Sequence, residues 1–294
     1  MKLTIGMSCY DDFHGVWFTI QSIKMYHPEV IDDVKFIVID GNPGQSHGIE
    51  VEKLIAKLTN KHGQNALYVS NETWASTASR DYIFQFAETP YVLCLDSHVM
   101  LAPGSIKKLI EHFDNDPTTK DIISGPIYDD NNNILATHMT RKWDYNMLGG
   151  WELDMDKIKT DEKYIVDMMG LGVFACTKES WPGFNRNFKG FGGEEGYIHD
   201  KIRKNGGEAI CFPWLKWLHR FPRPDGAKYN NIYEDRINNY FHGYIELNKQ
   251  PDDIIDYYSK SNELEGQQRT GISKEKLKLM YEKCKIDQQI SSLE

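Results

Sequence analysis

The chain of 294 residues is 40% hydrophobic and 12% aromatic, which is enough apolar material for a large folded domain and excludes a disordered protein. Its formal net charge is −9, so the bulk charge does not support nucleic-acid binding, although a local basic patch could still provide it. No apolar run approaches the roughly 20 residues that a membrane-spanning helix needs, which indicates a soluble protein.

The first half of the chain alternates apolar runs with segments of helical periodicity. The apolar runs predict strands, and the spacing of apolar residues between them predicts helices. The strands are expected at 3–9, 36–39, 66–69, 91–95 and 122–124, and the helices at about 16–26, 49–61, 76–87 and 105–113. This alternation predicts an α/β fold with a mostly parallel, open sheet and flanking helices on both faces.

The second half is less regular. Its sequence indicates a polar turn at 129–133, an aromatic loop or sheet edge at 143–151, strands at 173–176 and 209–212, a glycine-rich loop at 188–196 and a short helix at 197–204. Polar segments with helical character follow to the end. No repeat or flexible linker marks an independent second domain, so we expect one α/β domain over 1–230 and a helical C-terminal extension over 231–294.

The five cysteines predict buried thiols. Cys9, Cys94, Cys176, Cys211 and Cys284 are odd in number, lie far apart and contain no Cys-x-x-Cys pair. Such spacing is typical of a reducing compartment and argues against a disulfide framework or a zinc knuckle. The N-terminal segment has a short apolar run that soon meets two aspartates, which indicates a core strand and not a signal peptide. We therefore expect a cytoplasmic protein.

Aspartates follow two of the predicted strands. Asp40 comes after the second strand and Asp96 after the strand at 91–95. In open parallel sheets, ligands bind outside the carboxyl ends of the strands, so both residues are candidates for ligand binding. Aspartate is also common in turns after strands, and for Asp40 alone this structural explanation is equally good.

The most specific local motif is Leu-Asp-Ser-His at 95–98. On an extended turn, the carboxylate of Asp96 and the imidazole of His98 can point the same way and hold a divalent cation. Mn²⁺ accepts both oxygen and imidazole ligands, and the diphosphate of a nucleotide sugar would fill its open positions. The cation would then neutralise the leaving nucleoside diphosphate. The structural alternative is that Asp96 and Ser97 cap the next helix and His98 packs in the core.

Five segments occur in a specific order along the chain: Ser79-Arg80, Leu95-Asp-Ser-His98, Gly190-Phe-Gly-Gly-Glu-Glu195, Asn205-Gly-Gly207 and His219. Over about residues 1–225, this ordered set resembles the family-2-like GT-A glycosyltransferases, and in motif pattern the catalytic domain of polypeptide N-acetylgalactosaminyltransferases. That family carries Asp-Ser-His, then Trp-Gly-Gly-Glu-Asn, a Gly-Gly pair and a metal-binding histidine. The resemblance implies a GT-A, Rossmann-like fold over 1–230 and transfer of a sugar from a nucleotide sugar, a UDP-sugar, to an acceptor hydroxyl.

The resemblance also implies roles for individual residues. Asp96, His98 and His219 would ligate Mn²⁺ or Mg²⁺. The nucleotide sugar would be bound by Asp40 beside the base or ribose, by Arg80 near the diphosphate or sugar, and by Asp96 and Ser97. Arg220 and Arg223 lie on a segment that departs from the family's, and they could either reach the phosphates of the donor or be solvated charges. Trp181 and Phe191 would wall the sugar pocket, because flat rings match the apolar faces of a pyranose, although core packing is the more ordinary explanation for Trp181.

Glu194 and Glu195 are the candidate catalytic carboxylates. The resemblance implies that Glu194 lies near the transferring sugar. An inverting transferase needs a carboxylate base beside the acceptor hydroxyl, and either glutamate could provide it, whereas a retaining enzyme needs no such base. The resemblance favours retention. We expect residues 216–230 to form a loop that closes over the donor, on which basic side chains such as Lys228 either reach phosphates or are solvated charges.

The sequence departs from that family where Phe191 replaces its tryptophan and Glu195 its asparagine, so the sugar and the acceptor stay open. The acceptor could be a protein, a glycan or a DNA base. In the DNA alternative, a phage-type enzyme acts on hydroxylated bases, and Trp214, Trp217 and Tyr229 could stack on bases beside nearby basic residues. A further alternative is a non-enzymatic nucleotide-sugar-binding protein. The sequence does not decide the oligomeric state.

Overall fold

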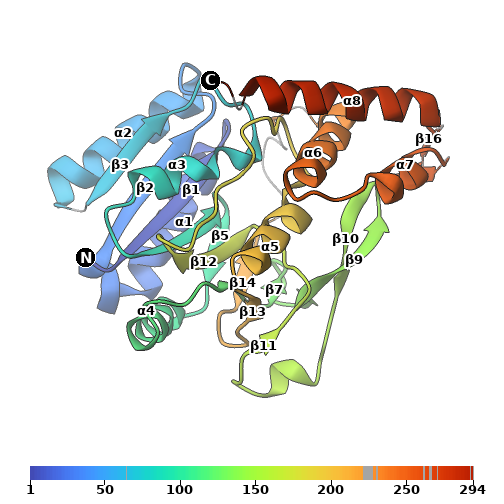
Figure 1. Ribbon diagram of the computed structural model, residues 1–294. Helices are drawn as coiled ribbons and strands as arrows, with labels where there is room; N and C mark the ends of the chain where they lie inside the picture. The colour runs from blue at the N-terminus through green and yellow to red at the C-terminus, as the bar shows by residue number, and fades with distance from the viewer. Residues whose placement is uncertain are drawn as a thin grey trace.

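The computed structural model describes residues 1–63, 65–220, 228–229, 231–260, 262–264, 267–269, 271–291 and 293. Its centre is an eight-stranded mixed sheet in the order β11-β13-β6-β12-β4-β1-β2-β3 (Figure 1). The parallel half consists of β1 (Leu3–Cys9), β2 (Val34–Asp40), β3 (Ala66–Ser70) and β4 (Tyr91–Asp96). The other half, in which β12 and β11 run antiparallel to their neighbours, consists of β6 (Ile122–Ser124), β11 (Tyr164–Ile165), β12 (Val173–Thr177) and β13 (Ala209–Cys211).

The register brings the carboxyl ends of the four parallel strands to one edge of the sheet. Ser8 pairs with Asp96, Cys9 pairs with Asp40, and Asp40 pairs with Ser70. The loops that follow these strands therefore converge, as the alternation of strand and helix in the sequence predicts.

Helices cover both faces of this sheet (Figure 1). They are α1 (Phe13–Tyr26), α2 (Ser46–His62), α3 (Asp81–Phe86), α4 (Ser105–Asn115) and α5 (Glu194–Lys204), with 3-10 turns η1 (Pro28–Asp33), η2 (Thr77–Arg80) and η3 (Lys157–Lys159). The helix predicted over 76–87 is divided into η2 and α3. The α3 segment lies very close to β1, because a Cβ atom on Gly6 would lie 2.1 Å from Cγ2 of Ile83.

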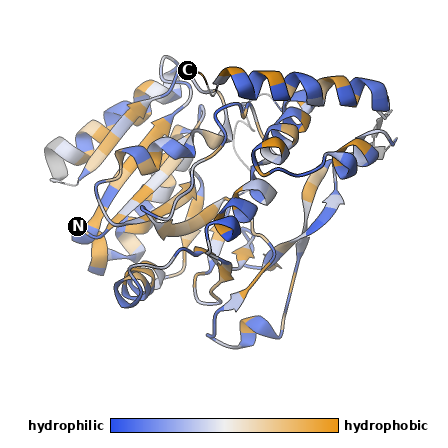
Figure 2. Ribbon diagram, in the orientation of Figure 1, coloured by the Kyte–Doolittle hydropathy of each residue, from blue (hydrophilic) through white to orange (hydrophobic). Residues whose placement is uncertain are grey.

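Two apolar cores lie on the two faces of the sheet. Side chains alternate along each strand, so Leu93 and Leu95 pack with Ile20 of α1, whereas Val92 and Cys94 pack with the α3 and α5 side. Figure 2 shows this concentration of apolar residues on the central strands. All five cysteines are buried free thiols, as the sequence predicts.

A second, smaller sheet has the order β5-β14-β7-β8. Its strands are β5 (Val99–Leu101), β7 (Ile127–Tyr128), β8 (Ile134–Ala136) and β14 (Trp217–His219). The segment predicted as an aromatic loop or sheet edge is an antiparallel hairpin of β9 (His138–Asp144) and β10 (Met147–Glu152).

Two of the C-terminal helices pack on this hairpin, and the third packs on those two. They are α6 (Tyr233–Glu246), α7 (Asp252–Tyr258) and α8 (Lys274–Ser291), with a short strand pair, β15 (Asn262–Leu264) and β16 (Gln267–Arg269), between the last two. Leu148 of β10 shares one core with Ile237 and Tyr258, so the helical extension is joined to the rest by a continuous apolar cluster. Within the described part of the chain, no helix combines the length and the apolar character needed to cross a bilayer.

Candidate active site

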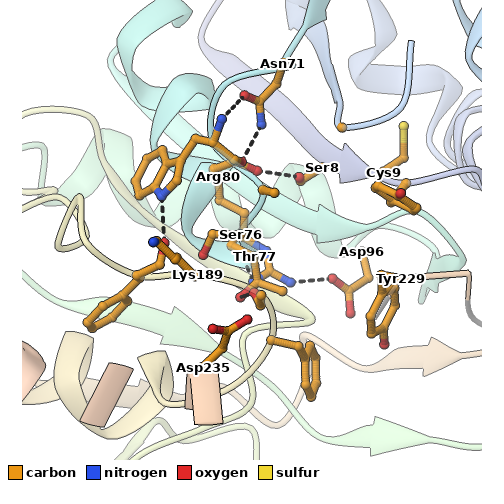
Figure 3. Close-up of a pocket in the computed structure, with 18 of the residues that line it drawn as sticks. Ser8, Cys9, Asn71, Ser76, Thr77, Arg80, Asp96, Lys189, Tyr229 and Asp235 are labelled. Carbon is orange, nitrogen blue, oxygen red and sulfur yellow. Dashed lines mark hydrogen bonds and ion pairs between the residues drawn. The ribbon is translucent and has the colours of Figure 1, made fainter. Parts of the chain in front are cut away.

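A cavity of about 540 Å³ lies at the carboxyl edge of the parallel strands (Figure 3). Its lining comes from four parts of the chain: the ends of β1, β2 and β4, the segment around η2, the glycine-rich loop before α5, and the start of α6. The lining residues include Ser8, Cys9, Tyr10, Asp12, Gly41, Asn71, Trp74, Thr77, Arg80, Asp96, Ser97, His98, Arg186, Lys189, Gly190, Phe191, Tyr229, Ile232 and Asp235. This is the edge at which the sequence predicts ligand binding.

Three side chains from two sheets meet at this edge. Asp96 ends β4, His98 immediately precedes β5, and the antiparallel pairing of β5 with β14 sets His219 opposite Val99. Nε2 of His98 lies 3.1 Å from Nε2 of His219, which is 3.6 Å from Oδ2 of Asp96. Ligands about 2.1 Å from one cation are spaced by about 3 Å, so this donor set fits a divalent metal ion.

Hydrogen bonds on the Nδ1 side of the His98 ring, opposite the Nε2 that faces His219, fix its orientation. Its Nδ1 donates to Oδ2 of Asp12 at 3.1 Å, and Ser97 Oγ donates to the same oxygen at 2.6 Å. A proton on Nδ1 leaves the lone pair of Nε2 directed at the cluster, as a metal ligand requires. Burial would raise the pKa of Asp12, but the hydrogen bonds from His98 and Ser97 outweigh it and lower the pKa to about 2. Asp12 is therefore an ionised partner that fixes this tautomer.

Arg80 supplies a buried positive charge beside the cluster. Its guanidinium bonds Oδ1 of Asp96 at 2.7 Å and lies 3.7 Å from Oε1 of Glu194. Burial would raise the pKa of Asp96, but the Arg80 charge outweighs it and holds that pKa well below its usual range. Asp96 is therefore an anion in the folded protein, and Arg80 lies in the cavity wall where it can meet a diphosphate.

The two glutamates expected to be catalytic do not line the cavity. Glu194 is 2% exposed and accepts a hydrogen bond of 2.5 Å from Thr77 Oγ1, while its other oxygen has no hydrogen-bond partner among the described residues. Burial, reinforced by the charge of Glu194, raises the pKa of Glu195 above its usual range. Glu194 begins α5 and bonds to Thr77 of η2, whereas Glu195, the next residue, is half-buried.

The other residues predicted to bind the donor lie in different places, and none of those that the structure describes lines the cavity. Asp40 is buried and accepts from Tyr68 and from the backbone of Asn42, both at 2.9 Å, so it supports the floor under Gly41 without lining the cavity. Arg220 lies over the ring of Phe18, 5.7 Å from its centroid, and not at the cavity. Arg223 and most of the expected closing loop fall outside the described residues.

The aromatic predictions divide in the same way. Phe191 lines the cavity and stacks on Tyr229, with ring centroids 5.5 Å apart. Trp181 does not line the cavity but packs against a core, the more ordinary explanation, with its ring stacked on Phe84 at 4.2 Å.

Of the three aromatic residues considered for stacking on bases, Tyr229 alone is among those that line the cavity. Trp217 is buried and donates its indole N–H to Gly125, and Trp214 packs on Phe212. Trp214 and Trp217 therefore do not join Tyr229 in the lining of the cavity.

Sequence comparison decides the family. The sequence model of the family described as "Glycosyl transferase family 2" matches residues 4–181, which is more than half of the chain. The chain belongs to glycosyl transferase family 2. The family-2 match contains Asp12, Arg80, Asp96 and His98, whereas His219 and the start of α5 lie beyond it. A search of curated protein sequences finds no significant match.

Solved structures agree with the family-2 assignment. GalNAc-T7 with UDP, GalNAc and Mn²⁺ superposes with a TM-score of 0.67 at 18% identity, over 88% of this chain and 50% of that one. S. aureus TarS 1–349 gives 0.55 at 14% identity, over 88% and 70% of the two chains. The mannosyltransferase PcManGT from Pyrobaculum calidifontis, with GDP-Man and Mn²⁺, gives 0.55 at 14% identity, over 84% and 64%. This chain thus spans half the length of the GalNAc-T7 chain, and the fold they share is GT-A.

Two of the carboxylates that line the cavity, Asp12 and Asp235, are not among the site residues predicted from the sequence. Asp12 follows β1, so the rule that singled out Asp40 and Asp96 could have found it. Asp235 has no comparable signal, since it begins a helix of the extension and reaches the cavity only through tertiary packing.

Proposed function

We propose that this family-2 protein is a divalent-cation-dependent glycosyltransferase that moves a sugar from a UDP-sugar to an acceptor hydroxyl. The observation that carries the proposal is the convergence of Asp96, His98 and His219 at the carboxyl end of β4, beside Arg80 and at the wall of the cavity, which Asp96 and His98 line. Structures of two proteins with the same fold, GalNAc-T7 and PcManGT, contain a nucleotide or nucleotide sugar together with Mn²⁺.

Asp96, His98 and His219 would hold Mn²⁺ or Mg²⁺, which stabilises the negative charge that develops on a departing nucleoside diphosphate. Asp12 holds His98 in the tautomer that can bind the ion. Arg80 compensates the Asp96 carboxylate and provides a second positive group for the phosphates. In this arrangement the chain contributes mainly by fixing charges and excluding water, because the donor carries its own leaving group.

The donor lies across the carboxyl ends of β1, β2 and β4, with its nucleoside near Tyr10 and Gly41, which line that side of the cavity. Its sugar then extends past Asp96 toward Phe191 and Tyr229, whose stacked rings offer an apolar face to a pyranose. The acceptor would enter the cavity from the side of Phe191 and Tyr229, where the sugar lies.

The test is a screen of nucleotide release. Purified protein is incubated with UDP-GalNAc, UDP-GlcNAc, UDP-glucose or GDP-mannose and Mn²⁺, with and without a chelator. We expect release from at least one UDP-sugar, its loss on chelation and its recovery on adding Mn²⁺ back. Asp96→Ala and His98→Ala should abolish the release, whereas His138→Ala, on the hairpin away from the cavity, should not. Nucleotide binding without release over long incubation would support the non-enzymatic alternative instead.

A further inference from the structure

We infer that Asp235 is the carboxylate that binds the hydroxyl groups of the transferred sugar. The inference rests on the proposed function, because it takes the cavity to be the site of a nucleotide sugar. It assigns to the first turn of α6 the role that the family resemblance gives to Glu194.

The first argument is the state of the carboxylates around the cavity. Asp12 is bonded to His98 and Ser97, and Asp96 is bonded to Arg80. Asp235 also lines the cavity, but its carboxylate forms no hydrogen bond or ion pair with any of the described residues. Its acceptor oxygens are therefore available to a ligand, and carboxylates form strong, short hydrogen bonds with hydroxyl donors.

The second argument is the space left for this side chain. Gly190 has φ 59°, and a Cβ atom there would lie 3.3 Å from Oδ2 of Asp235. The carbonyl of Gly190 accepts a hydrogen bond of 3.0 Å from the backbone N–H of Thr77, which fixes this loop to the edge of η2. The absence of a side chain at Gly190 therefore leaves room for the Asp235 carboxylate beside the loop. Figure 3 shows the Asp235 carboxylate directed into the cavity toward Thr77.

The third argument is where Asp235 lies along the donor. Figure 3 shows Asn71 and Cys9 on one side of the Arg80–Asp96 ion pair and Asp235 with Tyr229 on the other. A nucleotide sugar whose diphosphate lies at that ion pair, with its nucleoside over β1 and β2, places its sugar on the side of Asp235.

The fourth argument is that Asp235 is held in place. The next residue, Arg236, is 5% exposed and donates to Asn231 at 2.6 Å and to the carbonyls of Phe191 and Asn146, both at 3.4 Å. The start of α6 is thereby tied to the cavity wall and to the β9–β10 hairpin. A ligand that binds here therefore does not have to order the backbone that carries Asp235.

Glu194 is poorly placed for the same task. It is almost fully buried, does not line the cavity and accepts a 2.5 Å hydrogen bond from Thr77. Its second carboxylate oxygen has no hydrogen-bond partner among the described residues, but it is buried, so the surrounding wall would have to open before a sugar could reach it.

The experiment compares the binding of UDP with that of UDP-GalNAc, UDP-GlcNAc and UDP-glucose by calorimetric titration with Mn²⁺ present. The quantity measured is the ratio of the Kd of the sugar nucleotide to the Kd of UDP. Asp235→Asn should raise this ratio about tenfold or more for the preferred sugar, the size expected for a hydrogen bond to a charged group. The Kd of UDP itself should change less than about twofold, since UDP lacks the sugar.

Glu234→Gln is the matched control, because it removes the same charge from the same helical turn at an exposed position outside the cavity. The ratio should not change in this variant, and both variants should keep the wild-type thermal midpoint. An unchanged ratio in Asp235→Asn overturns the inference while the proposed function stands. A raised ratio in Glu194→Gln with an unchanged ratio in Asp235→Asn returns the role to Glu194. If the wild-type protein binds neither UDP nor any sugar nucleotide, the proposed function fails and takes this inference with it.

Discussion

The Nε2 atoms of His98 and His219 lie 3.1 Å apart, although 121 residues separate the two histidines in the chain. Two imidazoles have little reason to approach tip to tip unless they share a proton or a cation. The ionised Asp96 beside them gives the pair the composition of a metal centre.

Metal binding should raise the thermal stability through this pair. Mn²⁺ in excess should raise the midpoint of unfolding of the wild-type protein by several degrees, because an ion that binds the folded state stabilises it by mass action. His219→Ala should lose most of this increase, since it removes one of three protein ligands. Differential scanning fluorimetry with and without chelator measures the effect. An equal rise in wild type and variant would mean that the ion binds elsewhere.

Asp12→Asn should weaken Mn²⁺ binding about 10–100-fold without touching a ligand, because residues that orient a metal-binding histidine have effects of this size. An amide can no longer hold the proton on Nδ1 of His98 by charge. Asp11→Asn is the control, since Asp11 has φ 52°, a conformation that asparagine tolerates well. Titration followed by Mn²⁺ electron paramagnetic resonance gives the two dissociation constants. Equal constants in both variants would exclude the orienting role.

Arg80→Met should destabilise the fold by about 3 kcal/mol, because it leaves the buried carboxylate of Glu194 and the half-buried carboxylate of Asp96 without their partner. Arg186→Met, at an exposed position of the same cavity, should cost little. Urea unfolding curves measure both values. A small effect in Arg80→Met would show that the ion pair is not needed for folding.

Trp181 and Phe191 should respond in opposite ways to truncation. Trp181→Ala should cost on the order of 3 kcal/mol of stability, as for other large core side chains, and leave nucleotide binding unchanged. Phe191→Ala should cost less stability and reduce nucleotide release, because its ring faces the cavity and Tyr229. Urea unfolding and the release assay together separate the two roles. The reverse pattern would place the sugar against Trp181.

The buried His199 should make the protein acid-sensitive. Burial lowers its pKa to about 4, so between about pH 6.5 and pH 4 the unfolded chain binds a proton that the folded chain does not. The contribution of His199 to the free energy of unfolding is therefore fully present above about pH 6.5. As the pH falls toward 4, the free energy of unfolding decreases by roughly 3 kcal/mol. His199→Gln should lose less stability than wild type over this window. Urea unfolding at pH 7 and pH 5 tests the difference, and parallel losses would contradict it.

The parallel half of the fold could be predicted because each strand there is a short apolar run of its own. The runs at 3–9 and 91–95 are β1 and β4 almost residue for residue. The division of the helix at 76–87 could not be predicted, since the segment is held by tertiary contacts, Thr77 to Gly190 and Ile83 to Gly6, that no local pattern shows. The pairing of β9 with β10 could not be predicted either, because Trp143 and the backbone of Leu148 contact Tyr240, which lies more than 80 residues further along the chain.

The site shows the same limit. Asp96 and His98 form a local motif at a strand end, whereas His219 could be named only through the family resemblance. Its position depends on the pairing of β14 with β5, which no local pattern encodes. Glu194 was expected to face the sugar, but the sequence could not show that Thr77 and Arg80 enclose it. Asp235 was missed for the converse reason, as only tertiary packing brings it to the cavity.

The pairing of β14 with β5 makes the proposed metal centre sensitive to chain length. His219 stands opposite Val99, and successive residues of a strand point to opposite faces. One amino acid added between the tight turn at 212–215 and this strand would shift the strand by a single step and turn the imidazole away from Asp96. A length variant of this kind would keep the main sheet yet lose its ion, so the spacing in this segment matters as much as the histidine itself.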